Sequence, residues 1–115
     1  MNSPRPQMRV LLGNEPRVYR EALAVAFRAS RPEANVIAVD PGELDAAVAV
    51  VRPALVVCSA LTELVQSHAS AWALLYPDGA RLAVSSVGGE QETAGDLDLD
   101  GLLSLADRGI ARIPA

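Results

Sequence analysis

The sequence predicts an α/β domain built on a doubly wound, mostly parallel sheet. Two observations favour this class. Short apolar segments of strand length alternate with segments of helical periodicity, which is typical of βαβ units with right-handed crossovers. One strand-length segment, residues 54–58, is apolar at every position, as expected for a central parallel strand covered on both faces. The chain of 115 residues has the length of one domain. We expect that domain at residues 8–113, after a disordered lead-in at residues 1–7.

The first half of the chain predicts two strands and two helices. A short apolar run stops at Gly13-Asn14, as expected for a buried strand that ends in a turn. Apolar residues then follow at helical spacing from Arg17, with most charged residues, Arg20 included, on the other face. A β-branched run comes next, and the last segment is apolar at i, i+3, i+4 and i+7. The predicted elements are a strand at 9–12, a helix at 17–30, a strand at 35–39 and a helix at 43–51.

The second half of the chain predicts further strands and helices with a polar loop between them. The spacing of His68, Ala71, Trp72 and Leu75 indicates a helix that ends at Pro77-Asp78-Gly79. The predicted elements are a strand at 54–58, a helix at 68–75, a strand at 81–85, a loop at 86–95 and a helix at 99–107, with Asp98 as its N-cap and Gly109 just past its end. The alternation of Asp and Leu at 96–100 also fits a strand. We expect about four strands in the order 2-1-3-4, shortened at the C-terminus.

Composition excludes several classes of function. All ten basic residues are arginines and none of them cluster, and the net charge is −4, so we expect no direct nucleic-acid binding. The lone Cys58 excludes an internal disulfide and a cysteine-rich zinc site. No stretch reaches the roughly 18 apolar residues of a membrane span, and the start, with two prolines, does not resemble a signal peptide. We expect a cytoplasmic protein that needs no cofactor and binds no metal.

The order of several motifs resembles the receiver domains of bacterial response regulators, of the type found in helix-turn-helix regulators. The motifs are the strand-and-turn segment at 9–15, Arg20-Glu21-Ala22-Leu23, Arg52-Pro53 followed by the apolar run to Ser59, and the segment at 76–85. The resemblance covers residues 9–86. It implies the flavodoxin-like receiver fold. In the family, a carboxylate accepts a phosphoryl group beside Mg²⁺, a hydroxyl and a lysine.

The resemblance also implies that this chemistry has been lost. Ser59 stands at the position of the acceptor Asp, and Asn14 and Glu15 replace the acidic pair, so only one carboxylate remains. Ser85 keeps the hydroxyl, but the chain has no lysine. The resemblance places Asn14, Glu15, Ser59 and Ser85 together at the carboxyl edge of the sheet, as a vestigial phospho-acceptor pocket. The same four residues also fit a plain role as turn residues and caps.

We therefore expect the protein to be a non-enzymatic, phosphorylation-independent regulatory module that acts through protein–protein contact. An open, apolar edge on the last strand predicts a homodimer. The alternative is a small-ligand switch that uses the vestigial pocket. A minor alternative rests on Gly42-Glu43-Leu44-Asp45, which resembles a motif of STAS domains, the anti-sigma-factor antagonists. A catalytic pair of Ser59 and His68 has no support in the sequence, because nothing places the two side chains together.

Overall fold

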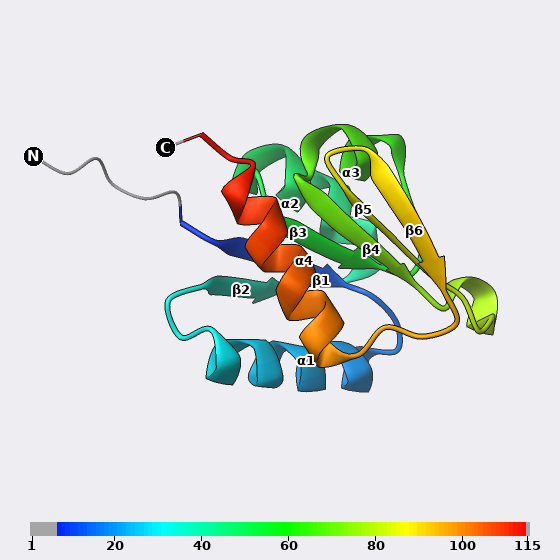
Figure 1. The fold of residues 1–115 in the computed structure, drawn as a ribbon. Helices are drawn as coiled ribbons and strands as arrows, with labels where there is room; N and C mark the ends of the chain where they lie inside the picture. The colour runs from blue at the N-terminus through cyan, green and yellow to red at the C-terminus, as the bar shows by residue number, and fades with distance from the viewer. Residues whose placement is uncertain (1–6, 115) are drawn as a thin grey trace, which may run out of the picture.

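The fold is a six-stranded mixed sheet with helices on both faces (Figure 1), seen in a computed structural model that describes residues 7–114. The α/β class predicted from the sequence is confirmed. The predicted lead-in falls mainly on residues 1–6, which lie outside the described residues. The strands are β1 (Arg9–Gly13), β2 (Asn35–Ala38), β3 (Leu55–Cys58), β4 (Ala71–Leu75), β5 (Ala83–Val87) and β6 (Glu90–Ala94). The helices are α1 (Arg17–Ser30), α2 (Leu44–Val51), α3 (Glu63–His68) and α4 (Leu99–Ala111), with short 3₁₀ turns η1 (Pro41–Glu43) and η2 (Pro77–Gly79).

The first four strands form a parallel half-sheet in the order β2-β1-β3-β4. Alternate side chains of these strands enter two separate cores. One core lies under α1 and α4 and includes Phe27 and Leu102, both fully buried. The other lies under α2 and α3 and includes Leu11, Val48 and Trp72. Because α1 and α2 cover opposite faces, the strand order reverses between β1 and β3, which is where open α/β sheets leave a crevice for ligands.

The predicted helix at 68–75 is wrong. This segment contains the end of α3, at His68, and then the strand β4. Its spacing of apolar residues matched a helix turn, but Ala71–Leu75 is apolar at every position. Periodicity alone does not separate a short apolar run in a helix from a strand buried on both faces. Here β4 pairs with β3 on one side and β5 on the other, and its side chains enter both cores, with Ala73 in the core under α1 and α4 and Trp72 in the core under α2 and α3.

The sheet has six strands where about four were predicted, and it is mixed, with three parallel and two antiparallel pairings. β5 lies antiparallel to β4, and β6 lies antiparallel to β5. The residues that we predicted as a polar loop form β6 and the turn before it. Gly88 and Gly89 both have positive φ, 58° and 89°, as a two-residue type I′ hairpin requires. All five residues of β6 are exposed, so they lack the apolar alternation by which a strand is recognised.

The C-terminal helix α4 confirms one prediction in detail. The Asp98 carboxylate accepts a hydrogen bond of 2.8 Å from the backbone NH of Gly101, so Asp98 is the N-cap. The prediction that Gly109 follows the helix is wrong, because α4 continues to Ala111 and buries Gly109 in its last turn. A Cβ atom on Gly109 would lie 2.2 Å from the backbone oxygen of Ala54. The missing side chain lets α4 approach the start of β3.

Candidate functional site

A cavity of about 800 Å³ opens at the carboxyl edge of the parallel half-sheet. Three segments line it: the turn after β1 together with the first turn of α1, the residue after β3, and the segment after β4. The cavity therefore spans the place where the strand order reverses between β1 and β3. Its volume falls within the range of about 300–1,000 Å³ that is usual for small-molecule sites. The lining residues are Glu15, Pro16, Tyr19, Ser59, Tyr76, Asp78 and Gly79.

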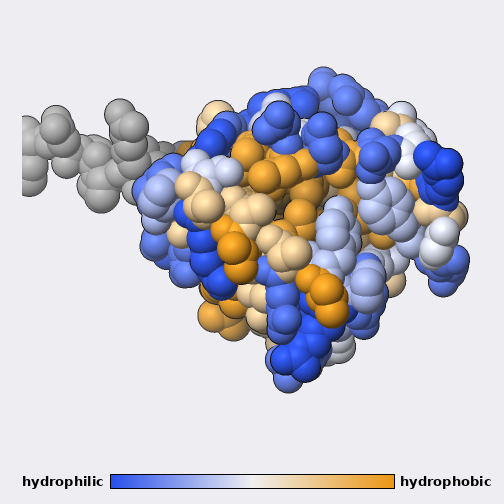
Figure 2. Space-filling view, turned by 90° about the horizontal axis from the view of Figure 1, so that it is seen from below, coloured by the Kyte–Doolittle hydropathy of each residue, from blue (hydrophilic) through white to orange (hydrophobic). Residues whose placement is uncertain are grey.

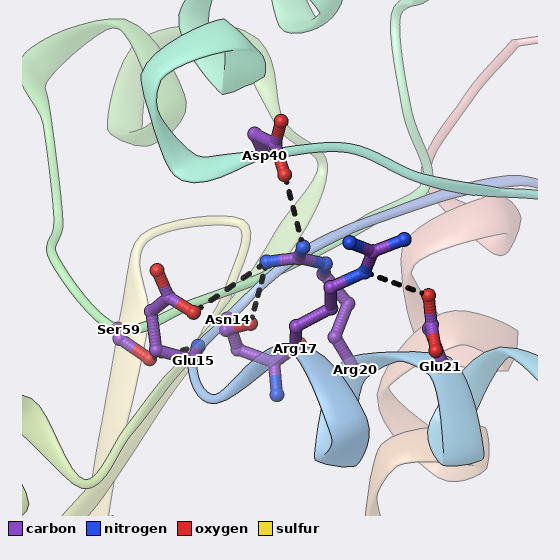
Figure 3. Close-up of polar contacts among 7 residues, drawn as sticks. All are labelled: Asn14, Glu15, Arg17, Arg20, Glu21, Asp40 and Ser59. Carbon is purple, nitrogen blue, oxygen red and sulfur yellow. Dashed lines mark hydrogen bonds and ion pairs between the residues drawn. The ribbon is translucent and has the colours of Figure 1, made fainter.

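Two of the predicted site residues meet at this cavity. The backbone NH of Glu15 donates a hydrogen bond of 2.8 Å to Ser59 Oγ (Figure 3). This bond joins the turn after β1 to the end of β3 across the crevice. The Glu15 side chain remains 57% exposed, so its carboxylate is open to solvent. Ser59 Oγ thus accepts a hydrogen bond from the backbone of the turn after β1, and Glu15 supplies a carboxylate among the lining residues.

Arg20 is the residue of this edge that sequence reasoning missed. We predicted it on the solvent-facing side of α1, yet it is only 4% exposed. Its guanidinium donates to the backbone oxygen of Asn14 (3.2 Å) and to Asp40 Oδ1 (3.1 Å), and it lies 3.7 Å from Glu15 Oε2 (Figure 3). Arg20 thereby ties the turn after β1 to the loop after β2. It is the first member of the buried stripe Arg20, Leu23, Ala24 and Phe27.

The opposite wall of the cavity is held by a tyrosine–carboxylate contact. The hydroxyl of Tyr76 donates to Asp96, and the backbone NH of Leu97 donates to the Tyr76 hydroxyl at 3.5 Å. The hydrogen bond to Asp96 raises the pKa of Tyr76 and lowers the pKa of Asp96. Burial, and to a lesser extent the Asp96 charge, raises the pKa of Tyr19. The three side chains therefore form one cluster, in which both phenols stay protonated near neutral pH.

The segment after β4 has an unusual backbone. Tyr76 and Asp78 have φ values of 50° and 54°, and Gly79 has a φ of 77°. Left-handed backbone is uncommon for residues other than glycine, and it is least expected for a bulky residue such as Tyr76. All three residues line the cavity. Backbone strain of this kind costs about 1–3 kcal/mol per residue and concentrates at ligand sites.

The other two predicted site residues lie apart from the cavity wall. Asn14 is fully buried, and neither side-chain polar atom has a hydrogen-bond partner among the described residues. Ser85 lies in the middle of β5, where it pairs with Ala73 and Glu92. Two strands, β3 and β4, separate it from β1, a distance of about 14 Å at the usual strand spacing. The antiparallel direction of β5 explains this position, since its carboxyl end points away from the cavity edge.

Cys58 and His68, two further side chains of potential reactivity, are not among the residues that line the cavity. Burial, with a smaller effect from Asp45, raises the pKa of the Cys58 thiol to about 12, so the thiol stays protonated and unreactive near neutral pH. His68 Nδ1 lies 2.9 Å from Ser67 Oγ, at the end of the sheet where β4 begins. The length of β4, about 16 Å, separates it from the edge that holds Ser59. Within residues 7–114, no group of three or more His, Cys, Asp or Glu side chains is placed to hold a metal ion.

Both tyrosines of the chain line the cavity, and the sequence held a weak signal of this. Tyr19 follows the turn after the first predicted strand by a few residues, and Tyr76 stands directly before Pro77-Asp78-Gly79. With the wrong helix assigned to 68–75, Tyr76 could not be placed at the edge of the sheet. In the described part of the chain, no helix is both long enough and apolar enough to cross a membrane.

Comparisons with known proteins identify no relative: no family model, no curated protein and no solved structure matches this chain.

Proposed function

We propose that this protein is a non-catalytic, phosphorylation-independent regulatory module that works by binding, and that the cavity at the carboxyl edge is its ligand site. The observation that carries the proposal is the position of the 800 Å³ cavity. It lies where β1 and β3 end side by side, which is the usual ligand position in an open α/β sheet.

Two further features support a binding role for this cavity. Its wall includes the left-handed residues Tyr76 and Asp78, and strain is retained where the surrounding structure fixes a functional geometry. Two of its lining residues, Glu15 and Ser59, are joined by a hydrogen bond, and the Arg20 guanidinium lies 3.7 Å from the Glu15 carboxylate. A cavity shaped before the ligand arrives loses less conformational entropy on binding.

The proposal of phosphorylation independence rests on the residues that occupy the edge. A serine hydroxyl at position 59 cannot form an acyl phosphate, and the chain has no lysine to balance phosphoryl charge. Ser59 Oγ is instead engaged by the Glu15 backbone. A relationship to receiver domains remains part of this proposal. The parallel order β2-β1-β3-β4 supports it, whereas the antiparallel β5 and β6 depart from the receiver pattern.

A thermal-shift screen tests the proposal. Small neutral, cationic and anionic fragments are added to the purified protein, and ligands of the native state raise Tm by mass action. We expect at least one class to raise Tm in the wild-type protein and to lose the effect in Ser59→Leu, which places a larger apolar side chain in the cavity wall and removes the hydroxyl that the Glu15 backbone binds. The control is Ser104→Leu, the same change on the exposed side of α4. Equal shifts in both variants, or no shift with any fragment, would contradict the proposal.

The second candidate is protein–protein contact, with a second copy of this chain as the partner. The observation that favours it is the outer face of α1, where Val18 and Val25 are 77% and 67% exposed. Figure 2, which views the molecule from the α1 side, shows hydrophobic side chains exposed among hydrophilic ones. Residues seven apart lie on one side of a helix, so the two valines present one surface.

Sedimentation velocity at tens of micromolar tests this second candidate. We expect a dimer that dissociates in the double variant Val18→Ser, Val25→Ser. The matched control is Val50→Ser on α2, a position that is 83% exposed. A monomer in the wild-type protein at these concentrations would remove this candidate and leave the ligand site unaffected.

A further inference from the structure

The charged side chains that line the cavity are acidic. Glu15 and Asp78 contribute carboxylates, and no basic residue is among the lining residues of the described chain. A third carboxylate, Asp96, is held against the Tyr76 hydroxyl. The nearest guanidinium, Arg20, lies 3.7 Å from Glu15 but is also bound by Asp40 and by the backbone of Asn14. The cavity therefore favours a cation and disfavours phosphates and carboxylates.

The remaining wall is largely aromatic and apolar. Tyr19, Tyr76 and Pro16 supply ring surfaces, and both tyrosines are partly buried. Cations are attracted to the faces of tyrosine rings, and more strongly where water is excluded. The hydrogen bond from the Tyr76 phenol to the Asp96 carboxylate increases the electron density of that ring. Such rings also provide the apolar contact that the body of an organic ligand needs.

We infer that the cavity binds an organic cation, an ammonium or guanidinium group on an apolar body, with Glu15 and Asp78 as its charge partners and the two tyrosines as its apolar wall. This inference rests on the proposed binding function of the same cavity. A free amine and the side chain of an arginine or lysine on a peptide share this chemistry. The experiment separates the two sources.

The first measurement compares a cation with a neutral molecule of the same shape. Uniformly ¹⁵N-labelled protein is titrated with choline and, separately, with 3,3-dimethyl-1-butanol, in which carbon replaces the charged nitrogen. We expect amide shifts clustered at Glu15, Tyr19, Ser59 and Gly79, with choline binding about five-fold more tightly than the alcohol. Acetyl-Gly-Arg-Gly-amide is titrated beside propylguanidinium, which has the same cation and alkyl chain without the peptide backbone. Tighter binding of the peptide assigns the source to a protein side chain, and equal binding assigns it to a small molecule.

The second measurement removes the charges one at a time. Glu15→Gln keeps the backbone NH that bonds Ser59, and Asp78→Asn keeps a residue type that tolerates left-handed backbone. We expect each variant to weaken choline binding about three- to ten-fold. Glu33→Gln, an exposed acid in the turn between α1 and β2, removes the same charge outside the cavity. This control is expected to bind choline as the wild-type protein does.

The outcomes separate this inference from the function on which it rests. If choline and the neutral alcohol shift the cavity amides with equal affinity, or if Glu33→Gln weakens binding as much as Glu15→Gln, the cation inference is overturned while the binding function stands. If an anionic fragment binds more tightly than choline, the inference is likewise overturned. If no probe of any charge shifts the cavity amides, the binding function itself fails.

Discussion

At the scale of single residues, the buried guanidinium of Arg20 holds together two loops at the carboxyl edge of the parallel strands. Arg20 connects two loops that would otherwise move independently, through the backbone oxygen of Asn14 and the carboxylate of Asp40. Arg17, which also lies in α1, instead pairs with Glu21 one turn along the exposed face of the helix. The two arginines are three residues apart and differ mainly in burial. The side chain of Arg20 is 5% exposed, and that of Arg17 is 76% exposed.

This pair gives a matched test of burial. We expect Arg20→Met to lower the free energy of unfolding by about 2 kcal/mol, because charge-assisted hydrogen bonds to a buried group contribute about 1.5–3 kcal/mol. We expect Arg17→Met to change it little, because exposed ion pairs contribute little. Urea denaturation followed by circular dichroism measures both. Equal effects of the two substitutions would show that the guanidinium of Arg20 does not tie the two loops together.

The buried thiol of Cys58 is expected to make the free energy of unfolding fall with pH in the alkaline range. Its pKa is raised from an ordinary value of 9.0 to about 12 in the folded protein. Between these values the unfolded chain loses the thiol proton and the folded chain keeps it, so the folded state binds more protons. Stability then falls as pH rises, by up to about 1.4 kcal/mol per pH unit for this one group. Tyr19 and Tyr76, whose pKa values are also raised, act in the same direction.

Comparison with Cys58→Ala isolates the thiol. We expect the unfolding free energy of the wild-type protein to fall more steeply between pH 9 and pH 11 than that of the variant. Parallel pH profiles would mean that Cys58 ionises in the folded protein at its ordinary pKa. The same burial predicts that a thiol reagent modifies Cys58 at pH 8 only after denaturation.

At the scale of elements, the helices and strands that the sequence predicted correctly are those whose apolar pattern fits only one kind of secondary structure. Strands β1 and β3 and helices α1, α2 and α4 lie close to their predicted positions because their length and spacing agree. β4 was missed because five apolar residues fit either structure, and β6 because exposed polar residues carry no pattern at all. Within α1, Arg20 was predicted on the solvent-facing side and is only 4% exposed. Of the predicted site, only Glu15 and Ser59 line the cavity, since Ser85 depended on a parallel strand.

The packing of α4 on the sheet depends on a glycine. We expect Gly109→Ala to lower the free energy of unfolding by about 1–3 kcal/mol, because the new methyl group would overlap the Ala54 carbonyl. This loss outweighs the gain of about 1 kcal/mol that alanine brings to a helix interior. The substitution would also disturb the 2.6 Å hydrogen bond that Ser70 Oγ donates to the backbone oxygen of Gly109.

The control is Gly42→Ala in η1, where an added Cβ meets nothing within 4 Å. We expect its thermal unfolding midpoint to stay near the wild-type value. If Gly109→Ala unfolds at the same temperature as Gly42→Ala, the close approach of α4 to β3 is not required for stability.

At the scale of the whole molecule, the sheet ends in a strand that discourages pairing. The open apolar edge on which the homodimer prediction rested is covered, because β5 and β6 continue the sheet. β6 carries Glu90 and Glu92 and is exposed throughout. Acidic side chains on an edge strand oppose the addition of another strand. Self-association therefore stays a prediction that now depends on α1.

We expect the double variant Glu90→Thr, Glu92→Val to associate with increasing concentration, because an uncharged β-branched edge pairs readily. Light scattering over a concentration series, with the wild-type protein alongside, measures this. The control is Glu33→Gln, which reduces the negative charge away from the sheet edge. An association that appears equally in the control would reflect net charge and not the edge.

The two ends of the sheet are expected to open at different free energies. β4 is parallel to β3 on one side and antiparallel to β5 on the other, so two kinds of pairing meet at this one strand. The parallel half needs helical crossovers before any of its strands can pair, whereas the hairpin closes through a two-residue turn. Amide protons of β6 are therefore expected to exchange with solvent during local fraying. Those of β1 and β3, in the centre of the sheet, are expected to exchange only when the whole domain unfolds.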